Sequence, residues 1–203
     1  MTDRPWESEP DSLDFEADGL PCVMRRHPHL GTWCGYVGVG EGHPLFGLPT
    51  NHLLKLPAAW FEGRRGLEGT GPMDFFMHIL RGNNPLEACE IGMALQVHGG
   101  VNYAEDSVPG GKPDGRWWFG FDCGHAGDYL HHNKDENVRR FMDQMVESMP
   151  KDARGFMRDI VNRDRVYRDQ QYVVSECQSL AAQLLAVVPV IERTKARGDQ
   201  HDR

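Results

Sequence analysis

Glycine is unevenly distributed along this chain of 203 residues, and its distribution restricts the folds that the chain can adopt. Most of the 23 glycines lie between residues 19 and 129, together with most of the tryptophans and histidines. Glycine at this density breaks a chain into short strands, turns and bulges, because it adopts backbone conformations that other residues rarely adopt. The region 19–129 should therefore form short β-strands rather than long helices.

Four short segments of this region have the composition of strands. Aromatic and β-branched residues favour strands at 21–26 and 32–39, and the turn-like sequence between them predicts a hairpin. Two further buried strands are predicted at 95–98 and 116–121. Residues 50–94 fit either short helices or apolar loops, because several prolines prevent one long element.

The C-terminal part of the chain has a different pattern. Apolar residues recur at steps of three and four over 133–149 and 172–188, which predicts two helices. Strands first and helices last indicate an α+β fold, with a small antiparallel or mixed sheet and C-terminal helices packed on one face. We expect a single domain over 19–190, followed by a polar tail at 191–203.

The net charge of −8 is concentrated near the N-terminus. Residues 1–18 contain seven acids and one base, which predicts a disordered acidic leader. The chain has no basic stripe, and this argues against binding duplex nucleic acid through its phosphates.

Several features of the sequence bear on where the protein acts. The chain has no run of about 18 apolar residues, so we expect no transmembrane helix and no membrane partner. It also has no recognisable secretory signal. The five cysteines form no CxxC pair, which argues against a structural zinc ribbon and favours reduced thiols. The expected location is therefore the cytoplasm, or the host cytoplasm for a phage-encoded protein.

The densest group of chemically capable residues follows the predicted strand 116–121. Asp122, His125 and Asp128 are spaced three apart in a glycine-broken loop. A loop at a strand end can present reactive side chains from a rigid support. Imidazole and carboxylate groups bind divalent metals, or act together as a general base and its orienting partner. The alternative is a structural turn in which Asp122 and Asp128 accept hydrogen bonds from backbone amides.

A second group is His98-Gly99-Gly100, at the end of the predicted strand 95–98. His98 is a candidate metal ligand and catalytic residue. The amides of Gly99 and Gly100 could cradle an anionic ligand as a nest. His43, held extended by the proline that follows it, is a further candidate metal ligand.

Cys34 offers an alternative that needs no metal. It would act as a nucleophile, with His98 as its base and Asp122 orienting the imidazole. The competing interpretation is a buried and unreactive strand cysteine.

Several of these motifs resemble a family of small proteins encoded by bacteriophages and some bacteria. The resemblance is carried by the segments His98-Gly-Gly, Trp118-Phe-Gly-Phe-Asp-Cys-Gly-His-Ala-Gly-Asp128, Cys34-Gly-Tyr-Val, His43-Pro-Leu-Phe-Gly47, Tyr167-Arg-Asp and the helix from Tyr172 to Leu184. It spans about residues 19–186. It implies a phage context and a site at these motifs, but no particular reaction. Residues 57–92 lie outside the shared pattern, which favours a lineage insertion.

Two functional hypotheses follow. In the first, the protein is a phage-type accessory hydrolase that acts on a phosphoester or nucleotide-like small molecule. A divalent metal ion activates water there. Its candidate metal ligands are His98, Asp122, His125, Asp128 and His43, and its candidate catalytic residues are His98, Asp122, His125 and Cys34. In the second, the protein is a non-catalytic binding protein that sequesters a small ligand or blocks a host protein. Convergence of the ligand side chains within about 5 Å would favour the metal site.

Overall fold

The computed structural model of the protein describes residues 5–28, 30–60, 88–125, 127–129, 144, 147–151, 154 and 166–201. Five strands of these residues form one sheet: β1 (Ser12–Ala17), β2 (Leu20–Arg26), β3 (Trp33–Gly40), β7 (Arg116–Asp122) and β6 (Tyr103–Glu105). Their order across the sheet is β1-β2-β3-β7-β6, and every neighbouring pair is antiparallel.

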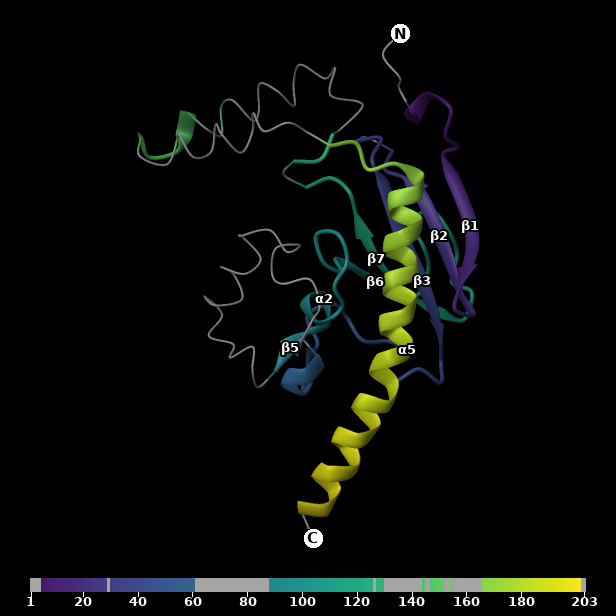
Figure 1. The fold of residues 1–203 in the computed structure, drawn as a ribbon, viewed down its shortest axis with the longest axis vertical. Helices are drawn as coiled ribbons and strands as arrows, with labels where there is room; N and C mark the ends of the chain where they lie inside the picture. The colour runs from purple at the N-terminus through teal and green to yellow at the C-terminus, as the bar shows by residue number, and fades with distance from the viewer. Residues whose placement is uncertain are drawn as a thin grey trace.

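The long helix α5 (Gln170–His201) packs across one face of this sheet (Figure 1). A smaller unit lies beside it. It contains a two-stranded sheet of β4 (Leu53–Leu54) and β5 (Cys89–Glu90), the turn η2 (Ala58–Trp60) and the short helix α2 (Ile91–Ala94). The predicted α+β architecture, with a C-terminal helix on one face of a small antiparallel sheet, is confirmed.

The close approach of α5 to the sheet depends on a glycine in the central strand. All of β3 except its last residue is buried. A Cβ atom at Gly35 would lie 2.7 Å from the Cys177 sulfur of α5 and 2.6 Å from the ring of Phe121. Only glycine leaves room for both neighbours, because these separations are shorter than real carbon contacts. This contact fixes the height of the N-terminal half of α5 above the sheet.

The two faces of the sheet carry different cores. The face under α5 holds the larger one, which includes Phe119, Phe121 and the helix residues Val173, Cys177 and Leu180. The opposite face holds a smaller cluster of Val23, Cys34, Tyr36, Val108 and Trp118. Trp117 packs against the larger core and Trp118 within the smaller one, as expected for successive residues of a strand.

Helix α5 has the apolar stripe that its sequence predicts. Val173, Cys177, Leu180 and Leu184 are fully buried against the sheet. By length and composition alone, Gln170–Arg193 is also apolar enough to cross a membrane, contrary to our expectation from the sequence. A core helix of a soluble protein meets the same criterion. Its burial against the sheet accounts for the stripe.

Two predictions of local structure are wrong. The described part of the expected disordered leader instead contains the 3-10 turn η1 (Pro5–Glu7) and the edge strand β1. Residues 95–98 form a turn after α2 and no strand. The polar tail predicted at 191–203 is a separate matter, since helix α5 includes its residues as far as His201. Most of the helix predicted at 133–149 lies outside the described residues.

Candidate metal site

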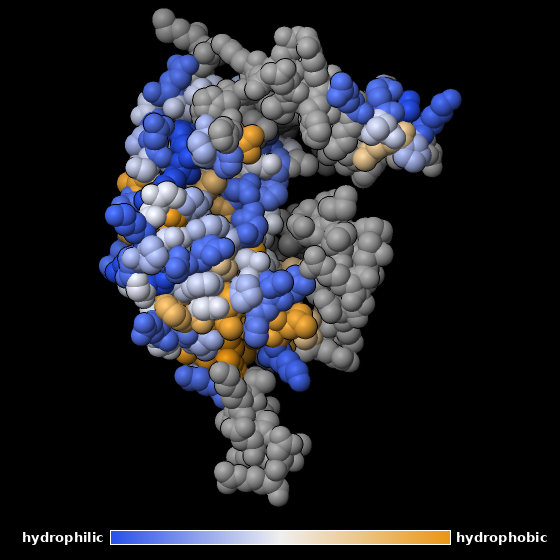
Figure 2. Space-filling model, turned by 180° about the vertical axis from the view of Figure 1, so that it is seen from behind, coloured by the Kyte–Doolittle hydropathy of each residue, from blue (hydrophilic) through white to orange (hydrophobic). Residues whose placement is uncertain are grey.

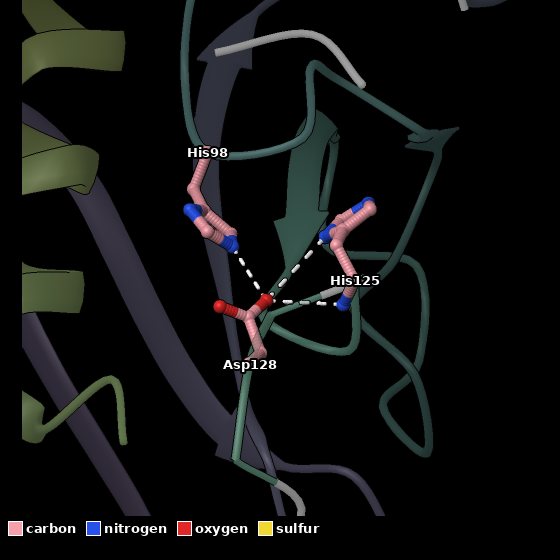
Figure 3. Close-up of side chains that lie close together, drawn as sticks. All are labelled: His98, His125 and Asp128. Carbon is pink, nitrogen blue, oxygen red and sulfur yellow. Dashed lines mark hydrogen bonds and ion pairs between the residues drawn. The ribbon is translucent and has the colours of Figure 1, made fainter. Parts of the chain in front are cut away.

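Three of the candidate site residues meet at one end of the sheet, where β7 ends and α5 begins (Figure 1). His125 and Asp128 lie on the loop that follows β7. His98 lies on the turn that follows α2, and its imidazole points toward the same place (Figure 3). One ligand atom from each of His98, His125 and Asp128 lies within 4.8 Å of the others, so this group could hold a metal ion.

His98 is held at three points. Its Nε2 lies 2.6 Å from Oδ2 of Asp128, and its Nδ1 lies 2.9 Å from the Tyr172 hydroxyl. Its backbone N–H donates to the buried carboxylate of Glu176 at 2.8 Å. An ionised carboxylate can only accept, so Nε2 carries a proton that it donates to Asp128, while Nδ1 is hydrogen-bonded to the Tyr172 hydroxyl.

Asp128 is the most buried member of the group, with a side chain only 2 % exposed. Its Oδ2 also accepts the backbone N–H of His125 at 3.0 Å, and its Oδ1 accepts from Nε of Arg168 at 2.9 Å. Burial alone would raise the pKa of this carboxyl. The hydrogen bonds and charges of His98 and Arg168 outweigh burial and hold the pKa below its ordinary value. Asp128 is therefore an ionised acceptor.

His125 occupies a position that glycine makes possible. Gly99 has a φ of +67°, and a Cβ there would lie 2.0 Å from the His125 ring. The ring therefore rests directly on the backbone of the turn that carries His98, and the two imidazoles meet edge to face with centroids 5.3 Å apart.

The Nδ1 atom of His125 is buried without a hydrogen-bond partner among the described residues. Its nearest carboxylate oxygens are Oδ1 of Asp122 at 3.8 Å and Oδ2 of Asp128 at 3.9 Å, both too distant for a hydrogen bond. A buried polar atom normally has a partner, so this nitrogen is an open ligand position inside the group.

Asp122 lies beside the group and is not part of it. Its Oδ1 accepts the backbone N–H of Gly124 at 2.7 Å, and its Oδ2 accepts from the side chain of Asn102. This is the structural turn weighed as the alternative from sequence. Asp128 makes the corresponding backbone contact with His125, so for Asp128 the turn and the cluster coexist.

Two predicted site residues lie elsewhere in the protein. Both ring nitrogens of His43 bind backbone groups: Nε2 lies 2.9 Å from the Leu184 carbonyl oxygen, and Nδ1 accepts from Leu45 N–H at 3.2 Å. His43 thus anchors the middle of α5 and is no metal ligand. Burial lowers its pKa and favours the neutral ring that these contacts require.

Cys34 packs on the face of the sheet opposite α5, in the smaller core, whereas His98 contacts α5. Burial, with a smaller effect of the Asp122 charge, raises the pKa of the Cys34 thiol to about 11. The proposed pairing of a Cys34 nucleophile with His98 is wrong, because the two side chains lie on different faces and the thiol stays protonated.

The glycines after His98 do not form the predicted anion nest. Gly100 N–H donates to the Val97 carbonyl at 3.0 Å and is not available to a ligand. The Gly99 position is covered by the His125 ring. Both glycines serve close packing instead, since a Cβ at Gly100 would lie 2.9 Å from the Gly92 carbonyl oxygen.

Sequence reasoning missed three residues around the group: Arg168, Tyr172 and Glu176. They lie at or just before the N-terminal end of α5 and contact Asp128 or His98. Tyr172 and Glu176 are four residues apart and therefore share a helix face. Two signals were available: the segments Tyr167-Arg-Asp and Tyr172 to Leu184 are among the motifs of the resemblance, and a glutamate lies within the apolar stripe of the predicted helix, where carboxylates are rarely buried without partners.

A separate pocket of about 250 Å³ lies toward the other end of α5. It is lined by Pro44, Leu48, His52, Leu53, Leu54, Lys55 and Ile191. Apolar residues also gather at this end of the molecule, near where α5 extends past the sheet (Figure 2). Ile191 is 19 positions beyond Tyr172, which corresponds to roughly 28 Å along a helix. The pocket is therefore separate from the histidine cluster.

Comparisons of this chain with protein-family models, with curated proteins and with solved structures find no match.

Proposed function

We propose that the protein is a metal-dependent hydrolase with its metal ion held by His98, His125 and Asp128. The observation that carries this proposal is the buried and unpartnered Nδ1 of His125, next to an ionised carboxylate and a second imidazole. An ion among the three atoms would satisfy that nitrogen and use a donor set of two imidazoles and one carboxylate. Such a set suits zinc and other first-row transition metals.

The surroundings of His98 fit a metal ligand. For Nε2 to bind an ion, its proton must move to Nδ1, and the Tyr172 oxygen at 2.9 Å can accept a hydrogen bond from that position. A second hydrogen bond of this kind fixes the ring orientation of metal-binding histidines. The backbone bond to Glu176 holds the residue in place without using the imidazole.

Three protein ligands leave a coordination position for water, which is the arrangement of catalytic rather than structural zinc sites. A metal ion bound there lowers the pKa of its water and supplies a nucleophile at neutral pH. Arg168 contributes a fixed positive charge beside the group, with a side chain 28 % exposed. These charges favour an anionic substrate, so we assign phosphoesters and nucleotide-like small molecules as the substrate class.

The first experiment measures metal content and metal response. We expect the protein purified without chelator to contain close to one transition metal ion per chain, and apoprotein to gain thermal stability from added Zn²⁺ or Co²⁺. His125→Ala should lose both effects, whereas His52→Ala should keep them, because His52 is exposed and far from the group. Absence of metal and of any metal-induced stabilisation in the wild type would overturn the site.

A second experiment tests the reaction. The metal-loaded protein is incubated with phosphomonoesters, phosphodiesters and nucleotides, and the products are separated. Turnover that the chelated protein and His125→Ala both lack supports the hydrolase. If a ligand binds at the metal and is recovered unchanged after denaturation, the protein is a sequestering protein instead. A phage context for either activity remains a prediction from the sequence motifs.

A further inference from the structure

Two backbone hydrogen bonds between described residues connect the segment that carries Asp128 to the segment that carries Arg168. Asp128 and Val166 form an isolated parallel bridge. Among the described residues its backbone hydrogen bonds are Tyr129 N–H to Val166 O at 2.9 Å and Val166 N–H to Gly127 O at 2.8 Å. Two backbone hydrogen bonds between described residues constrain the position of this ribbon only weakly, so side-chain contacts matter for holding it in place.

The two faces of this ribbon have different partners. Successive side chains of extended segments point to opposite faces. Asp128 and Arg168 bind each other on the front, toward His98. Tyr129 follows Asp128 in sequence and Tyr167 precedes Arg168, and both tyrosine rings contact the indole of Trp6 on the back of the ribbon. The ring centroids are 5.0 Å and 5.1 Å apart, respectively.

A single carboxylate completes the back of the ribbon. Oε2 of Glu9 accepts from Arg26 at 2.7 Å, from the indole N–H of Trp33 at 3.0 Å and from the Tyr167 hydroxyl. Its Oε1 accepts the backbone N–H of Gln170, the first residue of α5, at 3.0 Å. Glu9 therefore links β2 and β3 to the ribbon and to the helix. Its side chain is only 13 % exposed, so these charge-assisted bonds are shielded from bulk water.

We propose that the N-terminal segment Pro5–Asp11 positions the metal site, with Trp6 and Glu9 holding the ribbon from behind so that Asp128 stays aligned with His98. This inference rests on the proposed metal site for its function. Trp6 and Glu9 act on the ligands through Tyr129, Tyr167 and Gln170 and are therefore positioning residues. The physical reason is that a ligand must be held to within a fraction of an ångström, and the contacts of Trp6 and Glu9 add to the two backbone bonds that the described residues of the ribbon make.

The test compares three variants that weaken the back of the ribbon with one that weakens the fold elsewhere. Glu9→Gln removes the charge, Tyr167→Phe removes one hydroxyl, and Trp6→Ala removes the ring contact. The control is Leu13→Ala, because Leu13 packs against the larger core from the edge strand β1. Circular dichroism melting ensures that each full-length variant is folded at the assay temperature.

Two measurements are made on each protein. The first is Co²⁺ affinity, read from the visible absorption of the bound ion. We expect it to fall about 10-fold in Glu9→Gln and in Trp6→Ala, the lower end of the effect of outer partners on metal sites, and less in Tyr167→Phe. The second is the downfield proton resonance of His98 Nε2–H in the metal-free protein, which should broaden or shift upfield in the same variants.

Leu13→Ala should keep the Co²⁺ affinity and the His98 proton resonance of the wild type, even if its Tm falls as far as that of Glu9→Gln. The proposal is overturned if the ribbon variants bind Co²⁺ and show the His98 proton as the wild type does. It is equally overturned if Leu13→Ala loses both signals to the same extent, since the segment would then contribute only general stability. If the wild type binds no Co²⁺, the proposed function fails separately, and the His98 resonance alone decides the positioning role.

Discussion

The contact between Gly99 and His125 makes one substitution especially informative. Gly99 has a φ of +67° and lies against the His125 ring, where a Cβ would be 2.0 Å from the nearest ring atom. Gly47 has a φ of +74°, and a Cβ there would meet nothing within 4 Å. Gly99→Ala and Gly47→Ala therefore impose the same backbone strain, but only Gly99→Ala displaces a proposed ligand.

The expected magnitudes separate these two effects. A left-handed backbone costs an alanine about 1–2 kcal/mol, and both variants should lose that stability. The obstructing atoms at Gly99 belong to a ring that can rotate away, so the additional loss should stay below about 1 kcal/mol. Metal binding should differ far more. Loss of one of three ligands should exceed the about 10- to 100-fold effect of outer partners, so we expect at least about 100-fold weaker binding for Gly99→Ala.

The assay pairs urea unfolding of the metal-free variants with a Co²⁺ titration followed by absorbance. We expect similar urea midpoints for Gly99→Ala and Gly47→Ala, and loss of Co²⁺ binding in Gly99→Ala alone. If Gly99→Ala bound Co²⁺ as tightly as Gly47→Ala, the ring of His125 would not be a ligand, and the three-residue site would be refuted.

Three further outcomes follow from the same contacts. Because the pKa of Asp128 is lowered, its contacts stabilise the fold fully above the ordinary carboxyl pKa of about 3.9, and this stability is lost as the pH falls through the folded value. In urea unfolding, the free energy of unfolding of Asp128→Asn should therefore decrease less at acid pH than that of the wild type. His43→Ala should cost about 1 kcal/mol of unfolding free energy, from the Leu184 carbonyl left unpaired, and leave Co²⁺ affinity unchanged. Alkylation of Cys34 at neutral pH should be at least about 100-fold slower in folded than in urea-unfolded protein, because its pKa of about 11 suppresses the thiolate; rapid labelling of the folded protein would contradict its placement.

Local patterns in the sequence predicted the elements whose residues alternate or repeat strongly. Strands β2, β3 and β7 and the buried stripe of α5 were recognisable, because each sequence contains the period of its own structure. The order of the strands in the sheet could not be recognised in this way, since β3 and β7 pair although 75 residues separate them in the chain. Nothing in either strand specifies such a distant partner.

The acidic N-terminal segment shows how composition can mislead where periodicity does not. In β1, Leu13, Phe15 and Ala17 face the core while Asp14 and Glu16 are exposed. This alternation of period two is a strand signal, and charges on an edge strand also discourage pairing with other chains. The seven acids of residues 1–18 outweighed that pattern in the sequence interpretation, which therefore predicted disorder.

The candidate site was predicted in part, for a reason that the fold makes clear. Asp122 and Asp128 are both three residues from His125, so spacing alone ranks them equally. Asp122 belongs to β7, and alternation along that strand directs it to the face away from α5, where it pairs in register with Cys34. Asp128 lies beyond the strand and meets Arg168, which immediately precedes the helix, and His98, which Tyr172 and Glu176 orient. The position of α5 thus decides that Asp128, and not Asp122, joins the histidines. That position depends on the packing of α5 at Gly35, which the spacing of residues within the loop cannot indicate.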